Sequence, residues 1–237
     1  MMKKTALYLL MLPVFFAACK SKCVEDLGVH SSRDLTVKPF DELKVSGPVK
    51  LIMRQDSSFK INILADSNAI GLVTTAVSGN QLTVKLDAKK YCGKDSVIVN
   101  VGIGDLKKLE AEEASKVYTA SGIIVNTLDM KLKGAVKLSM DISAMKLTTT
   151  TDGAASMVLL GQAGEHDIKS TGSISLNAFA FVAGKYDLDM NGVSDLKINA
   201  LNDLIIKTAG AADIRYKGNP KNIKEKQSGT YKLEKVN

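Results

Sequence analysis

The sequence contains no tryptophan, and aromatic residues make up only 5% of the chain. A globular β-sandwich usually fills a wide core with bulky rings, so this composition argues against such a core. Alanine, valine, isoleucine, leucine and methionine can fill a narrow core at normal packing density. The scarcity of rings therefore favours a slender domain over a thick one.

Histidine and cysteine are also scarce, with two and three residues. Neither Cys23 nor Cys92 has a CxxC partner or a nearby pair of histidines, so the spacing of a zinc site is missing. His166 falls at an apolar position of an alternating pattern, where we expect a structural residue. The sequence has no glycine-rich phosphate loop. We therefore expect no metal site and no cofactor.

The charge of the chain is mildly positive, with a formal net charge of +7. Lys3 and Lys4 belong to an N-terminal segment that we expect to be removed, which leaves 30 basic residues (32 − 2) against 25 acidic ones. A net charge near +5 on a chain of this size is too small to indicate a nucleic-acid partner. We expect no nucleic acid to bind.

Residues 1–18 have the pattern of a signal peptide. The apolar run from Ala6 to Phe16 is shorter than the roughly 20 residues of a membrane-spanning helix. It ends in Phe16-Ala17-Ala18-Cys19, which resembles a bacterial lipobox and implies lipidation of Cys19 after cleavage. Two or three acyl chains would then hold the N-terminus stably in a membrane. The alternative is an ordinary signal peptide followed by an incidental cysteine.

The mature chain is expected to consist of a tether and one domain. Residues 19–36 are polar and lack a sustained period, which is typical of a lipidated tether. The domain is expected over residues 37–237, with irregular N-terminal coils and a cap at 37–108, regular coils at 109–218 and a C-terminal cap at 219–237. In an oxidising compartment Cys23 and Cys92 either form a disulfide or remain two free thiols, and the sequence leaves both alternatives open.

One glycine-centred phrase recurs through the second half of the chain. Its glycines are Gly134, Gly153, Gly172, Gly192 and Gly210, at spacings of 19, 19, 20 and 18 residues. Four positions after each glycine stands a large apolar residue, namely Leu138, Met157, Leu176, Leu196 and Ile214. Apolar residues at even offsets on both sides of a glycine predict two short strands that meet at a corner. Such units must stack to bury their apolar faces, so the pattern predicts an all-β parallel solenoid with about 19 residues per coil.

The same even offsets surround Gly47, so the first coil is expected at Leu43–Met53. Ser115 is expected to open the regular array, because Leu109 and Ala111 precede it at the matching offsets. A further partial coil is expected at Gly218, and the alternating residues 229–236 are expected to lie along the last coil.

The irregular residues 55–95 are expected to cap the N-terminal end of the stack. Within them, residues 67–76 predict a short helix capped by Asp66 or Ser67.

A candidate ligand surface follows from the repeat. The third position after each of the five glycines is polar and points outward. It reads Lys137, Ser156, Ser175, Asp195 and Asp213, and the last four form the candidate surface. Stacked carboxylates could bind Ca²⁺ or act as acid and base, but no dense cluster of Asp, Arg, His and aromatic residues accompanies them. Asp213 is expected to pair with Arg215. These residues are interpreted as a ligand surface, with a merely solvated column as the alternative.

The recurring phrases also resemble a known family. They read Lys133-Gly-Ala, Asp152-Gly-Ala-Ala-Ser, Thr171-Gly-Ser, Asn191-Gly-Val-Ser and Ala209-Gly-Ala-Ala-Asp, after Phe40-Asp-Glu-Leu-Lys-Val-Ser-Gly-Pro-Val and before Tyr216-Lys-Gly-Asn-Pro220. Together with the lipobox, they resemble the autotransporter adhesin, head GIN domain family of Bacteroidota lipoproteins. The resemblance implies a right-handed parallel β-helix and brings no catalytic residues with it.

The expected function is therefore that of a cell-envelope lipoprotein, placed in the outer membrane and facing the periplasm or the cell exterior. Its domain would be a non-enzymatic, adhesin-like module for a protein or glycan ligand. The alternative is a carbohydrate-active enzyme, a polysaccharide lyase or hydrolase, on a β-helix scaffold.

Overall fold

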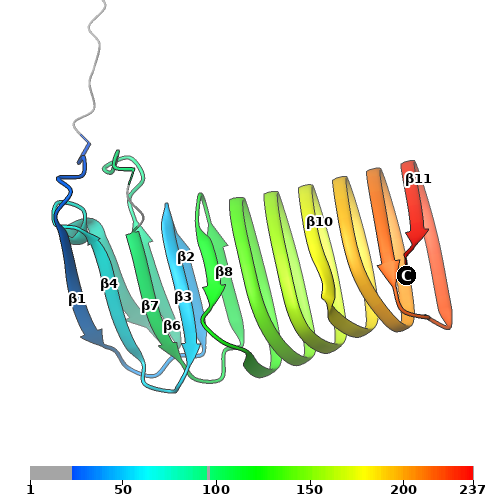
Figure 1. Cartoon of the computed structure of the whole chain (residues 1–237), viewed down its shortest axis with the longest axis horizontal. Coiled ribbons are helices and arrows are strands. Elements are labelled where there is room, and N and C mark those ends of the chain that lie inside the picture. The colour runs from blue at the N-terminus through cyan, green and yellow to red at the C-terminus, as the bar shows by residue number, and fades with distance from the viewer. Residues whose placement is uncertain (1–22, 95–96, 237) are drawn as a thin grey trace, which may run out of the picture.

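The computed structural model describes residues 23–94 and 97–236 and is built almost entirely of β-strands (Figure 1). Its elements in chain order are β1 His30–Thr36, β2 Glu42–Ser46, β3 Val49–Gln55, β4 Lys60–Asp66, the 3₁₀ turn η1 Ile70–Leu72, β5 Val73–Ser78, β6 Gln81–Leu86, β7 Val97–Ile103, β8 Lys108–Glu112, β9 Lys116–Thr119, β10 Ile123–Lys217 and β11 Asn222–Lys235. The expected signal peptide and Cys19 lie outside the described residues.

The strand β10 is 95 residues long and winds through successive turns that lie side by side in Figure 1. The repeated glycines stack on one another at one corner of these turns. Gly172, for example, has a φ of +107° and faces the backbone carbonyl of Gly153 so closely that a Cβ atom would collide with it. Glycine alone tolerates both this φ and this approach. The regularly spaced glycines of the sequence therefore lie on top of one another in the structure, one at the same corner of each turn.

The apolar column that follows the corners points into the core as predicted. Leu138, Met157, Leu176, Leu196 and Ile214 are each at most 2% exposed. They belong to one continuous apolar core that runs from Phe40 to Ile214. The predicted inward register is confirmed, since the neighbours Met157 and Leu176 are both buried.

The strands β2 and β3 form the turn predicted around Gly47, but this turn is not at the end of the stack. β2 pairs in parallel with β6 on one side and β8 on the other. β3 likewise lies between β7 and β9. The turn that comes first in the sequence is therefore flanked on both sides by turns that come later.

The prediction that Ser115 opens the regular array is wrong by two residues. Lys133 pairs with Glu112, and Lys137 pairs with Lys116, so Glu113 occupies the corner opposite Gly134. Glu113 accordingly has a positive φ of 62°. A slip of two residues returns every side chain to the same face of a strand, so the alternation of apolar residues cannot detect it.

The helix predicted for residues 67–76 is not formed. Only Ile70–Leu72 make a 3₁₀ turn, and Val73–Ser78 pair antiparallel with β6. The carboxylate of Asp66 accepts backbone hydrogen bonds from Asn68, Leu27 and Gly28. Asp66 thus binds the start of the described chain, and the 3₁₀ turn that follows has no side-chain cap.

The N-terminal tether, expected to reach residue 36, ends earlier. β1 pairs antiparallel with β4 over its whole length, from His30 to Thr36. Its sequence, HSSRDLT, has no apolar alternation, because β1 is an edge strand whose side chains are at most half-buried. Backbone pairing holds this strand, and backbone pairing leaves no hydrophobic signal in the sequence.

The C-terminal residues lie along the last turn of β10, as expected, but they form a complete turn. β11 pairs in parallel with Asp203–Tyr216, and Gly229 continues the column of glycines above Gly210. Gly218, where a partial coil was expected, instead lies against Ala200 at a different corner. The side chains of β11 remain largely exposed.

Candidate functional site

The predicted ligand column lies on the outer surface of β10. Ser156, Ser175 and Asp195 are exposed, and Asp213 is half-buried. Each stands three residues after a stacked glycine, so the four side chains follow one line along the stack.

Asp213 is already engaged within the protein. Its Oδ2 lies 3.0 Å from Nη2 of Arg215, which confirms the predicted ion pair. The hydrogen bond from this guanidinium lowers the pKa of the Asp213 carboxyl below its ordinary value. Lys232 of β11 is its register neighbour on the other side. A ligand would therefore meet an ion pair at this end of the column and a free carboxylate only at Asp195.

The same column continues toward the N-terminal end as three lysines. Lys137 pairs in register with Lys116, and Lys116 with Lys50. We call Lys50, Lys116 and Lys137 the lysine column. Sequence reasoning missed it because the expected corner at Ser115 put Tyr118 in the place of Lys116, and because Lys50 is far away in the chain.

A hollow of about 250 Å³ adjoins two of these lysines. It is lined by Pro48, Val49, Lys50, Tyr91, Gly93, Lys94, Ala114 and Lys116. We call it the lysine hollow, after Lys50, Lys94 and Lys116. Nζ of Lys50 also lies 5.4 Å from the centre of the Tyr118 ring, a cation–π distance.

The loop that closes one side of the lysine hollow is held in place covalently. A disulfide joins Cys92 to Cys23, and Val24 forms a parallel bridge with Tyr91. The hydroxyl of Tyr91 donates to Asp26 over 2.7 Å, and the backbone N–H of Lys94 donates to the other oxygen of the same carboxylate over 2.6 Å. Residues 23–26 therefore hold the backbone of Lys94 in place.

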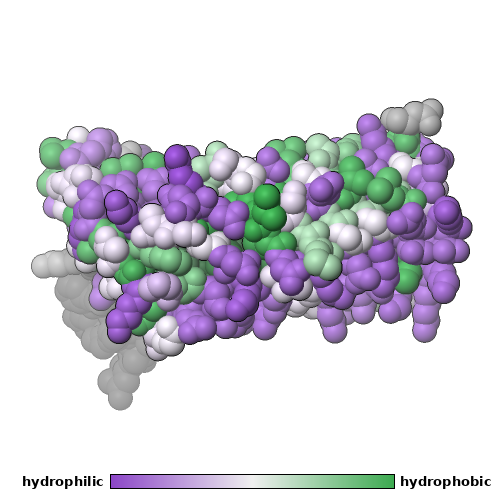
Figure 2. All heavy atoms as spheres, turned by 90° about the horizontal axis from the view of Figure 1, so that it is seen from below, coloured by the Kyte–Doolittle hydropathy of each residue, from purple (hydrophilic) through white to green (hydrophobic). Residues whose placement is uncertain are grey.

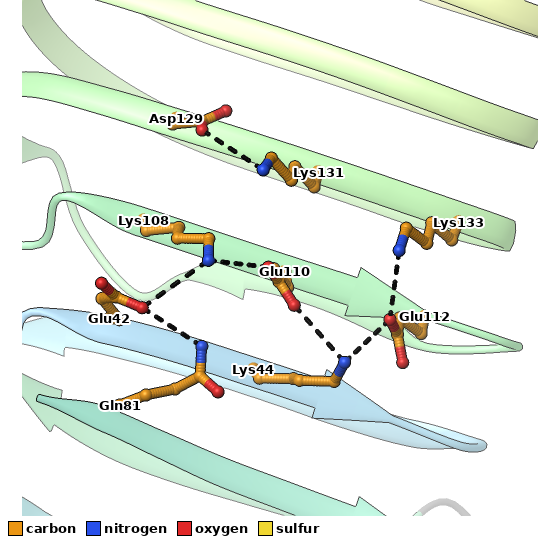
Figure 3. Close-up of polar contacts among 9 residues, drawn as sticks. All are labelled: Glu42, Lys44, Gln81, Lys108, Glu110, Glu112, Asp129, Lys131 and Lys133. Carbon is orange, nitrogen blue, oxygen red and sulfur yellow. Dashed lines mark hydrogen bonds and ion pairs between the residues drawn. The ribbon is translucent and has the colours of Figure 1, made fainter. Parts of the chain in front are cut away.

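The other face of the same turns carries a ladder of alternating charges (Figure 3). Nζ of Lys44 lies 2.9 Å from Glu112 and 3.4 Å from Glu110. Nζ of Lys108 lies 2.9 Å from Glu110 and 3.7 Å from Glu42. The hydrogen bond from Lys108 lowers the pKa of Glu110, and the hydrogen bond to Glu112 raises the pKa of Lys44. In this ladder Lys44 and Lys108 each lie beside two carboxylates that neutralise their charge.

His166 lies in the core, at the inward position that the sequence predicted. It is fully buried, and its Nε2 is 3.0 Å from the hydroxyl oxygen of Thr149. Burial lowers its pKa to about 3, so the ring is neutral at physiological pH. These contacts fit a structural residue.

The carboxylates considered for Ca²⁺ or catalysis do not gather into a metal-binding cluster. Within residues 23–94 and 97–236, no group of three or more His, Cys, Asp or Glu side chains is arranged to hold a metal ion. Asp189 borders a shallow hollow of about 270 Å³ together with Lys207 and Lys226. Glu25 and Asp26 border another beside the disulfide, where Asp26 accepts the two hydrogen bonds described above.

The remaining surface is mixed in character. Figure 2 shows that the underside carries hydrophobic residues near its middle and hydrophilic ones toward the β11 end. Ile124 and Met145 are the most exposed large apolar side chains of the described residues, at 73% and 70%. None of the described helices is long and apolar enough to cross a membrane.

Several solved structures have a similar fold. A "putative adhesin" of Bacteroides fragilis superposes with a TM-score of 0.82 at 19% identity, over 90% of this chain and 100% of its own. A "putative adhesin" of Parabacteroides merdae gives 0.68 at 20% identity, over 91% and 100%. A "putative lipid binding protein" of Parabacteroides distasonis gives 0.66 at 17% identity, over 91% and 100%. At these identities the likeness concerns the fold alone.

None of the curated proteins matches this chain. A family model does match, over residues 39–220, which is most of the domain. The chain belongs to the family described as "putative auto-transporter adhesin, head GIN domain".

Proposed function

We propose that this protein is a cell-envelope lipoprotein whose domain, a right-handed parallel β-helix, serves as a non-enzymatic, adhesin-like binding module. The observation that carries the proposal is membership of the adhesin family, over residues 39–220. The β-helix is supported by the parallel pairing of β10 with β8, β9 and β11 and by the stacked glycine corners.

The proposed place of the protein is the outer membrane, facing the periplasm or the cell exterior. Lipidation of Cys19 would provide the attachment, and the lipobox-like residues before it support this. An adhesin-like family is consistent with a location in the cell envelope.

The proposed ligand is a protein or a glycan that contacts the outer column of Ser156, Ser175, Asp195 and Asp213. Strand pairing fixes these side chains without loops, so little conformational entropy would be lost on binding. Extended faces of stacked repeats commonly bind through many weak polar contacts of this kind.

The test is to screen the mature protein on a glycan array and to measure the release of reducing sugar from the same glycans. We expect binding without release. Release of sugar would instead support the carbohydrate-active enzyme considered from the sequence. If binding is unchanged after Asp195 and Asp213 are replaced, the ligand contacts a different surface of the protein.

A further inference from the structure

The lysine column lacks the carboxylate partners that Lys44 and Lys108 have on β2 and β8. No carboxylate of the described residues lies within ion-pair distance of Lys50, Lys116 or Lys137. Register nevertheless stacks the three on adjacent strands, about 4.8 Å apart. Like charges placed side by side on a sheet are destabilising. The column therefore carries a cost in the isolated protein that an external anion would relieve.

The opposite face of the same turns makes the contrast clear. There, Lys44 and Lys108 each lie within 4 Å of two carboxylates (Figure 3). The charge ladder lies on β2 and β8 and the lysine column on β3, β9 and β10, and both are built from parallel pairs of the same spacing. Parallel pairing therefore does not force lysines to stack without partners. What distinguishes the column is that three lysines without carboxylate partners stand directly beside one another on paired strands.

The loop after β6 adds a fourth cation. Lys94 is exposed beside Lys50 and Lys116 in the lysine hollow, and its backbone is held by Asp26. Lys89, in the same loop, is exposed as well. In Figure 1 this loop and the first described residues lie together at one end of the molecule, far from β11.

The disulfide places this cluster close to the proposed lipid anchor. Cys19 precedes Cys23 by four residues, and four residues of extended chain span at most about 14 Å. Because Cys23 is bonded to Cys92, and Lys94 follows Cys92 by two residues, the lysine hollow stays near the point where the chain would enter the membrane. A tether this short lets the lysines come within one Debye length of the membrane surface, about 8 Å, where they attract anionic lipids.

We propose that the lysine hollow and Lys137 bind the anionic headgroups of the membrane that carries the N-terminus. This inference rests on the lipid anchor proposed above and adds an electrostatic contact to it. The lipid and the lysines would together hold the N-terminal end of the domain against the bilayer. Ser156, Ser175 and Asp195 lie farther along the stack, so the membrane contact would leave them accessible to a ligand.

The test uses the mature chain from Lys20 to Asn237, secreted into the periplasm so that the disulfide forms and no acyl chain is present. Sedimentation with phosphatidylglycerol–phosphatidylcholine vesicles should show binding that weakens with salt, and pure phosphatidylcholine vesicles should not bind. Each lysine near an anionic surface strengthens binding about fivefold. The K50Q/K94Q/K116Q variant should therefore bind about a hundredfold more weakly.

The matched control is K221Q/K224Q/K226Q, which removes the same charge from exposed positions at the β11 end. Its binding should stay within about twofold of the unmodified chain, because those lysines would face away from the vesicle. An equal loss in both variants would show that only net charge matters and would overturn the proposal. If the triple variant fails to fold, K94Q/K116Q is the substitute, because both of its lysines are exposed.

Two further measurements distinguish binding to anionic lipids from binding to a soluble polyanion and from the lipid anchor itself. Retention on immobilised chondroitin sulfate without binding to anionic vesicles would assign the lysine hollow to a soluble polyanion and would overturn the membrane contact. Palmitate labelling of the full-length chain tests the anchor alone. If the full-length chain is labelled but the K50Q/K94Q/K116Q variant of the unacylated chain binds vesicles as well as the unmodified chain, the anchor stands and the lysine contact is refuted.

Discussion

The imidazole ring of His166 lies 5.4 Å from the phenol ring of Tyr186, centroid to centroid, inside the apolar core. Phe181 makes an edge contact with the same imidazole at 5.6 Å. Nδ1 of His166 and the hydroxyl oxygen of Tyr186 are both buried without a hydrogen-bond partner in the described part of the chain. Burial accordingly lowers the pKa of His166 and raises that of Tyr186.

This arrangement predicts a dependence of stability on pH. The unfolded chain protonates His166 near pH 6.5, whereas the folded protein does so only near pH 3. Between these values the unfolded state binds the extra proton, so stability falls as the pH is lowered, by up to about 1.4 kcal/mol per pH unit. Chemical denaturation at pH 7.5, 5 and 4 should show that H166L loses less stability than the unmodified protein.

Leucine is the appropriate replacement because Leu147 and Leu204 fill the corresponding positions of other turns. H30Q, which replaces the exposed His30, provides the histidine control. Identical profiles for H166L and the unmodified protein would mean that His166 does not cause the acid sensitivity.

The stacked glycines predict a position-dependent cost of adding a methyl group. In G172A the Cβ atom would collide with the carbonyl of Gly153 at a φ of +107°, which should cost about 3 kcal/mol or more. In G79A the φ is also positive, but no atom lies within 4 Å, and the cost should be only about 1 kcal/mol. Urea denaturation of both variants measures the difference. Equal costs would mean that close stacking at the corner is unimportant.

The disulfide between Cys23 and Cys92 should stabilise the N-terminal end of the domain. It closes a loop across 69 residues of sequence, and the chain-entropy model gives about 4 kcal/mol for such a loop. Denaturation with and without a reducing agent should show this loss, and C23S/C92S should match the reduced protein. A non-reducing peptide map that detects two free thiols would contradict the pairing.

Lipidation is predicted at Cys19, which lies outside the described residues. Labelled palmitate should enter the unmodified protein in bacteria and should be absent from C19A, because the thioether bond requires this sulfur. C23S serves as the control and should still be labelled. Labelling that persists in C19A would refute the anchor.

The outer column is predicted to contribute to binding more than to folding. D195N/D213N should change the free energy of unfolding by less than about 1 kcal/mol, because Asp195 is exposed and the Asp213–Arg215 pair is more than one-third exposed. Thermal denaturation checks this expectation. If the glycan array identifies a ligand, its affinity should drop in the same variant. An unchanged affinity would exclude these carboxylates from the contact.

The sequence by itself determined the repeating part of the fold. Spaced glycines and apolar residues at even offsets predict which side chains point inward, because a strand alternates its faces with a period of two. Met157 and Leu176 are buried where this rule puts them. The outward position of Ser156 and Asp195 follows from the same alternation, so that part of the candidate site was predictable as well.

Only the tertiary structure decided which turns are neighbours. The corner at Glu113 was missed because a slip of two residues keeps every face unchanged, and β1 was missed because an edge strand of polar residues leaves no hydrophobic pattern. The placement of β2 between β6 and β8 depends on long-range packing that no local pattern records. It is this packing that stacks Lys50 on Lys116, and the disulfide that adds Lys94, so the lysine hollow exists only in the folded chain.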